Sequence, residues 1–89
     1  MWRKGIAIMR AVDLVVELFP ERTESVRRLY LQDEHFRAIC DDFALSVTSL
    51  RHFEARPDAH SRPEVADYHA VLRELTEELR RYIGASDTQ

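Results

Sequence analysis

The sequence is poor in the residues that build complex folds and reactive sites. Of its 89 residues, one is cysteine, two are glycine and three are proline. A single cysteine, Cys40, excludes an internal disulfide framework and any cysteine-rich zinc module. Two glycines, Gly5 and Gly84, leave no glycine-rich phosphate loop and little turn chemistry for a many-stranded fold. The shortage of turn residues therefore favours long helices.

Clustered positive charge is also missing from the chain. The formal net charge is −3, from 13 basic and 16 acidic residues, and no segment concentrates the basic ones. Because affinity for a phosphate backbone depends on such clusters, we expect no nucleic-acid binding. The N-terminal apolar run is interrupted by Arg10, Asp13 and Glu17, which argues against a signal peptide or a membrane span. We therefore expect a cytoplasmic protein.

The apolar residues that are present follow helical spacing, and proline separates the helical segments. Pro20 and Pro57 each interrupt a helix because proline lacks the N–H that donates to the preceding turn. Ser61 and Glu64 around Pro63 resemble a capping box at the start of another helix. The expected elements are a helix over 5–19, a long helix over 21–55, a turn over 56–62, a second helix over 63–83 and a tail over 84–89, with Gly84 as the helix stop.

Apolar residues on the two long helices repeat at coiled-coil spacing. On the first they recur at every seventh position from Leu29 to Leu50, and on the second the spacing alternates between three and four. Two helices joined by a short turn pack as antiparallel neighbours. We therefore expect one all-α domain over 1–89, an antiparallel, coiled-coil-like two-helix hairpin preceded by a short N-terminal amphipathic helix. The expected hairpin core is Phe36, Cys40, Phe43, Val47, Leu50, Val65, Tyr68, Leu72, Leu75, Leu79 and Tyr82.

The second helix is too short to cover the whole of the first. At 1.5 Å per residue it is about 31 Å long and reaches from Ala55 back only to about Phe36. Val26 and its apolar neighbours therefore need another partner, either the N-terminal helix or a second chain. Another seven-residue row, on the side away from the hairpin, predicts a second packing surface, with scattered exposed leucines as the alternative. The expected interaction residues are Val26, Leu29, Tyr30, Leu31, Ala38 and Leu45.

Asp33 interrupts the apolar positions of the long helix. Arg37 follows it by four residues, a spacing that allows an ion pair in the favourable orientation. A polar residue in a packed row can also set the register or the number of chains. Alternatively, the helices separate at this point and leave the carboxylate in water. The sequence leaves these interpretations open.

Three short elements resemble the small YdcH-like proteins of bacteria. They are Leu18-Phe19-Pro20-Glu21, Asp33-Glu34-His35-Phe36 and Asp42-Phe43-Ala44-Leu45. The resemblance covers roughly residues 13–84, although the second helix carries less lysine than is typical of that family. It implies a helical hairpin that often self-associates, in a family whose function is largely uncharacterised, and it brings no catalytic residues.

No pattern in the sequence indicates catalysis or a cofactor. Zinc needs three or four converging ligands, but His35 and Cys40 are five residues apart and project from different faces of a helix. Cys40 is expected to be a buried, unreactive thiol. The adjacent carboxylates Asp41 and Asp42 also project to different faces. We therefore expect no catalytic residue, no metal and no cofactor.

The sequence favours a non-enzymatic helical interaction module that self-associates or docks on a larger protein. The uncovered part of the long helix and the second apolar row are the reasons for this expectation. The alternative is a membrane-surface protein, anchored by Trp2, Arg3 and Lys4 together with the helix over 5–19. Asp13 opposes binding to anionic lipids, so the interaction module is the preferred interpretation.

Overall fold

The computed structural model describes residues 10–87, and the helices found there confirm the expected all-helical class. No strand occurs within this described range. Residues 5–9 of the expected N-terminal helix, and the proposed anchor at Trp2, lie outside it. The elements are α2 (Ala11–Leu18), η1 (Pro20–Arg22), α3 (Thr23–Gln32), α4 (Glu34–Glu54), η2 (Ala59–Ser61) and α5 (Pro63–Asp87), where η denotes a short 3-10 helix.

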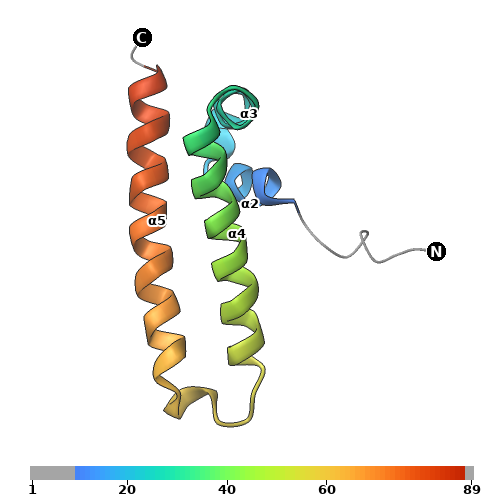
Figure 1. The fold of residues 1–89 in the computed structure, drawn as a ribbon, viewed down its shortest axis with the longest axis vertical. Helices are drawn as coiled ribbons and strands as arrows, with labels where there is room; N and C mark the ends of the chain where they lie inside the picture. The colour runs from blue at the N-terminus through green and yellow to red at the C-terminus, as the bar shows by residue number, and fades with distance from the viewer. Residues whose placement is uncertain (1–9, 88–89) are drawn as a thin grey trace, which may run out of the picture.

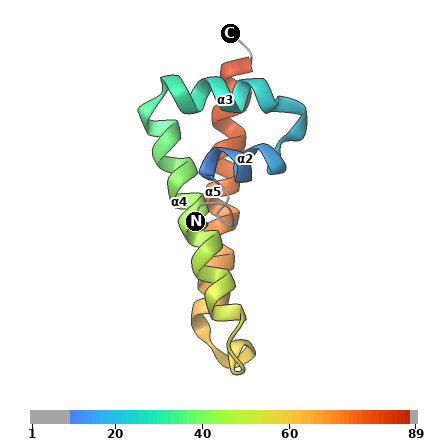
Figure 2. The ribbon, with the colours of Figure 1, turned by 90° about the vertical axis from the view of Figure 1, so that its right-hand side faces the viewer.

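The two longest helices, α4 and α5, form the frame of the molecule. They lie side by side, run in opposite directions and make the most extensive contact between any two elements (Figures 1 and 2). α2 and α3 cross one end of this α4–α5 pair, near the C-terminal end of α5 (Figure 2). The other end, with η2, extends away from the crossing helices, and the molecule measures 47 × 36 × 22 Å.

The single long helix expected over 21–55 is wrong, because the chain bends at Asp33. This residue has an extended backbone (φ −117°, ψ 111°), and its side chain accepts a hydrogen bond from the first turn of α4. Aspartate is among the preferred residues for capping a helix N-terminus in this way. Seven-residue spacing continues through the bend in the sequence, so the spacing alone does not reveal two helices.

The hydrophobic core lies where α2 and α3 cross the α4–α5 pair. Val26 was expected to need a partner, and the crossing helix α2 supplies it: Val15 of α2 and Val26 of α3 are both fully buried. Val26 is therefore a core residue, and its assignment as an interaction residue is wrong. The five largest fully buried side chains are Phe36, Leu79, Val15, Val26 and Cys40.

α5 begins at Pro63 and ends beyond Gly84. Proline suits the first position of a helix, where its missing N–H would have no partner. The expected capping box is wrong, because the Ser61 hydroxyl donates to the carbonyl of Asp58 instead. The expected stop at Gly84 is also wrong, since α5 continues to Asp87 and the segment packs against α3.

Gly84 lies inside α5, where glycine is a weaker helix former than alanine. A Cβ added there meets nothing within 4 Å, and alanine is the better helix former. Gly84→Ala is therefore expected to stabilise the fold by about 0.5–1 kcal/mol and raise the thermal midpoint. Ala85→Gly, one residue further along α5, is the matched control and is expected to lower it. A loss of stability in Gly84→Ala would contradict the continuation of α5.

Candidate functional site

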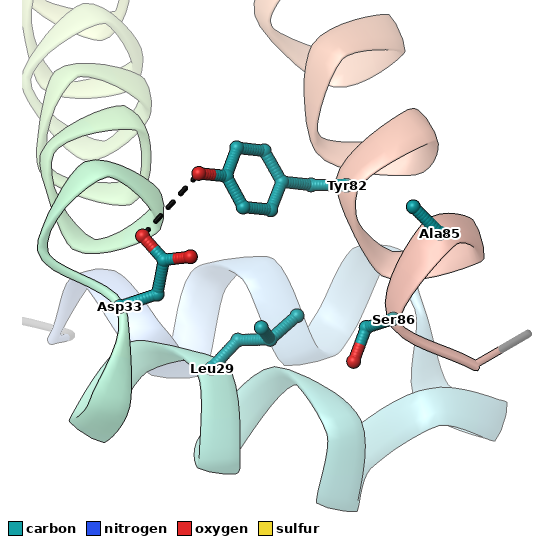
Figure 3. Close-up of a pocket in the computed structure, with 5 residues that line it drawn as sticks. All are labelled: Leu29, Asp33, Tyr82, Ala85 and Ser86. Atoms are coloured by element: carbon teal, nitrogen blue, oxygen red, sulfur yellow. Dashed lines mark hydrogen bonds between the residues drawn. The ribbon is translucent and has the colours of Figure 1, made fainter. Parts of the chain in front are cut away.

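The bend at Asp33 is held by contacts from both neighbouring helices and from α5. Its Oδ1 accepts a hydrogen bond from the backbone N–H of Phe36 at 3.0 Å. The same oxygen accepts one from the hydroxyl of Tyr82 at 3.3 Å, from a residue 49 positions away. Figure 3 shows Tyr82 reaching from α5 toward Asp33. One carboxylate oxygen thus caps α4 and ties the bend to α5.

Arg37 closes the other side of the bend by capping the end of α3. Its Nε donates to the carbonyl of Tyr30 at 2.9 Å, and its Nη2 donates to the carbonyl of Leu31 at 3.2 Å. The guanidinium also lies 5.8 Å from the centre of the Tyr30 ring. Of the interpretations left open for Asp33, the ion pair with Arg37 is not the one that forms. Because the helix breaks between them, Arg37 reaches back to carbonyls that α3 leaves unbonded.

A surface pocket of about 230 Å³ opens between α3 and α5 beside the bend (Figure 3). Its lining is Leu29, Asp33, Tyr82, Ala85 and Ser86. Arg28 donates a 3.4 Å hydrogen bond to the hydroxyl of Ser86, one of the lining residues. The carboxylate and both hydroxyls nearby already bond within the protein. Apart from Asp33 Oδ2, these polar side-chain atoms are therefore already used in hydrogen bonds within the protein.

His35 stacks on the outer side of this arrangement. Its ring lies 5.6 Å from that of Tyr82 at an interplanar angle of 21°, and its Nε2 is 4.0 Å from a Glu78 carboxylate oxygen. His35 is exposed and Glu78 is half-buried. This ion pair depends on protonation of the imidazole and contributes little at a solvated surface.

The capping contacts shift the pKa of Asp33 below its ordinary value. The backbone N–H of Phe36 is the main cause, and the Tyr82 hydroxyl adds to it, while partial desolvation acts in the opposite direction. Each donor favours the ionised carboxylate. The pKa of Tyr82 is raised, mainly by desolvation and then by the nearby Asp33 charge.

A lowered folded-state pKa makes Asp33 a source of acid sensitivity. The stabilisation it supplies is present above the ordinary aspartate pKa and is lost as the pH falls through the lower folded-state value. Asp33→Asn keeps an oxygen acceptor for the cap but has no proton to gain. Urea unfolding at pH 6 and pH 3 is expected to show a smaller loss of stability for Asp33→Asn than for the wild type. Asp42→Asn, an exposed change of the same charge on α4, is the control.

Cys40 is buried in the core, and the four histidines face solvent. Burial raises the pKa of the Cys40 thiol to about 12, so at neutral pH it is an unreactive part of the core. His52 and His60 are exposed, and His69 lies 3.4 Å from a carboxylate oxygen of Glu54. Within residues 10–87, no group of histidine, cysteine and carboxylate side chains is arranged to hold a metal ion.

The remaining expected interaction residues divide between two environments. Leu29 and Tyr30 are half-buried against the core, and the Tyr30 hydroxyl donates to Asp41 at 3.0 Å. Leu31 and Leu45 are 76% and 67% exposed, and Ala38 is exposed as well. The bend places Leu31 on α3 and the other two on α4, so the expected single row is wrong.

The residues expected to form the hairpin core are all buried or half-buried. Phe36, Cys40, Phe43, Leu50 and Leu79 are buried, whereas the other six are half-buried. Sequence reasoning missed Ile39 and Ile83, which each lie beside the apolar row of their helix. It also missed Leu14 of α2. The signal was present as a wider apolar stripe, which a packed helix uses when it touches more than one neighbour.

Comparison of the chain with protein-family models, with curated proteins and with solved structures found no match. None of the helices in the described part of the chain is sufficiently long and apolar to cross a membrane.

Proposed function

We propose that the chain is a non-enzymatic interaction module that binds an amphipathic, basic helix of another protein. The frame of the module is the antiparallel, coiled-coil-like hairpin of α4 and α5, preceded by the amphipathic α2. The binding surface is the outer face of α4, defined as Glu34, Ala38, Asp41, Asp42 and Leu45, all of which are exposed.

The observation that carries this proposal is the combination of an exposed leucine with carboxylates on one helix face. Leu45 is 67% exposed, and Asp41 and Asp42 precede it by four and three residues, which places them beside it on the helix. A helix face that packs only against its own core is expected to be polar here. An apolar centre with acidic flanks complements a partner helix of opposite charge.

The same acidic flanks disfavour self-association through this face, because two copies would place like charges together. They also support a protein partner over the membrane-surface alternative. Within the described part of the N-terminal helix, Val12, Leu14 and Val15 are buried in the core. These side chains are not free to enter a lipid interface. The occupant we propose is therefore a basic amphipathic helix.

Binding can be tested with a synthetic helical peptide of leucine and lysine, and with a leucine–glutamate peptide of the same pattern. We expect calorimetry to detect binding of the lysine peptide only. Leu45→Arg is expected to weaken it by about tenfold or more, because it removes the apolar centre and adds a like charge. Leu18→Arg changes an exposed leucine of α2 and is the matched control. Equal affinity of the two variants would overturn the proposal.

A further inference from the structure

The bend at Asp33 lies in a segment whose sequence is compatible with a continuous helix. Residues 21–55 contain no glycine or proline, and the apolar row from Leu29 to Leu50 keeps its seven-residue spacing through the bend. Only Asp33 separates α3 from α4. A change in the backbone of that one residue would therefore join them into one helix.

Side-chain hydrogen bonds at the bend replace part of the backbone hydrogen bonding of a continuous helix. In a continuous helix, the carbonyls of Tyr30 and Leu31 would accept backbone N–H groups, and the N–H of Phe36 would find a carbonyl. In the bent chain, Arg37 bonds both carbonyls and Asp33 bonds that N–H. Three backbone groups that a continuous helix would bond through its own backbone are therefore bonded by side chains in the bent chain.

Straightening removes α2 and α3 from their own core and exposes it. Val26 would leave the core that it forms with Phe36 and Leu79, all of them fully buried in the bent chain. An identical α2–α3 unit from another molecule carries the complementary surface, since it is the same sequence. A second copy therefore restores the packing of α2 and α3 on the α4–α5 pair that one straightened chain loses.

We propose that the chain forms a dimer with a second copy of itself by straightening at Asp33 and exchanging α2 and α3. Each α2–α3 unit packs on the α4–α5 pair of its partner, and α3 and α4 become one helix over 23–54. The exchange does not use the outer face of α4. It stands independently of the proposed function, and Leu45→Arg is expected to leave the dimer fraction unchanged.

Two substitutions at the bend are expected to move the equilibrium in opposite directions. Asp33→Ala removes the cap and provides the best helix former, so the dimer dissociation constant is expected to fall by about tenfold or more. Glu34→Pro places proline at the first position of α4, which the bent chain accepts because Asp33 is already extended. Inside a continuous helix proline disfavours the straight form by about a hundredfold. This variant is expected to remain monomeric.

Size-exclusion chromatography with light scattering over a range of concentrations measures these effects. Glu34→Ala is the control for the lost side chain, and it is expected to retain the dimer that Glu34→Pro lacks. Adding Glu34→Pro to Asp33→Ala is expected to return the protein to a monomer. The proposal is overturned if Asp33→Ala is monomeric at millimolar concentration, or if Glu34→Pro dimerises as well as Glu34→Ala.

Cross-linking distinguishes a dimer that exchanges α2 and α3 from a dimer that forms by contact between outer surfaces. Arg28 of α3 and Ser86 of α5 are joined by a hydrogen bond, so Arg28→Cys with Ser86→Cys places two thiols on elements that exchange separates. A short bismaleimide is expected to link the two thiols within one chain in the monomer and between chains in the Asp33→Ala dimer. The buried Cys40 does not compete. A dimer that shows only intrachain links would overturn the exchange.

Discussion

Phe36→Ala is expected to lower the free energy of unfolding by about 3–5 kcal/mol, the usual cost of truncating a buried phenylalanine. The side chain has no exposed surface, and its ring lies 5.4 Å from that of Tyr82. It sits in the first turn of α4, directly below the bend and between helices that are distant in sequence. Its removal therefore leaves a cavity that several helices line and that no single shift can close.

A domain of this size is stabilised by about 5–13 kcal/mol, so this loss is a large part of the total. Urea unfolding followed by circular dichroism measures it. Phe53→Ala provides the comparison, because Phe53 is half-buried near the other end of the α4–α5 pair and stacks on Tyr68. We expect its cost to be smaller, about 1–3 kcal/mol. If Phe53→Ala were the more destabilising, the core would not lie at the crossing of the helices.

The helical class was predictable because apolar spacing and proline report on local structure. Pro63 begins α5 at the expected residue, and Pro20 begins η1 after the single residue that follows α2. The side chains of the expected hairpin core are buried or half-buried because a spacing of three and four places them on one side of a helix. These features depend on residues within a turn or two of one another, which a single sequence displays directly.

The bend was not predictable, because the contacts that hold it are distant or ambiguous in sequence. Asp33 can cap a helix, pair with Arg37 or face water, and its spacing in the sequence does not decide among these. Tyr82 decides the outcome only once α5 has folded back over the bend. Gly84 indicates a helix stop in the sequence, but packing of the last turns of α5 on α3 outweighs the weak helix propensity of glycine.

The candidate binding face was predictable in part. Ala38 and Leu45 were expected to lie away from the hairpin, and both are exposed on α4. Val26 was grouped with them because nothing in the sequence states which helix covers it. Burial by α2 is a tertiary outcome, since the apolar stripe on that helix is equally compatible with packing against another chain. The distinction between core and surface for such residues comes from topology rather than spacing.

Val15→Asp is expected to abolish cooperative folding at room temperature. Val15 is fully buried on the face of α2 that packs into the core shared with Val26 and Leu79. An aspartate there must either hold a charge without water or take up a proton, and removal of its hydration costs about 4 kcal/mol or more. Together with the lost valine packing, this cost is close to the whole stability of a domain of this size.

Leu18→Asp is the control that distinguishes the effect of burial at Val15 from the effect of adding a carboxylate to α2. It introduces the same carboxylate into the same helix, but Leu18 is 42% exposed, so the charge stays hydrated and the effect is expected to be below about 1 kcal/mol. Far-ultraviolet circular dichroism and urea unfolding compare the two variants. If α2 were instead a loosely attached segment, Val15→Asp would leave the unfolding of the other helices unchanged. A collapse of the whole helical signal in that variant alone would show that α2 completes the core and covers Val26 within one chain.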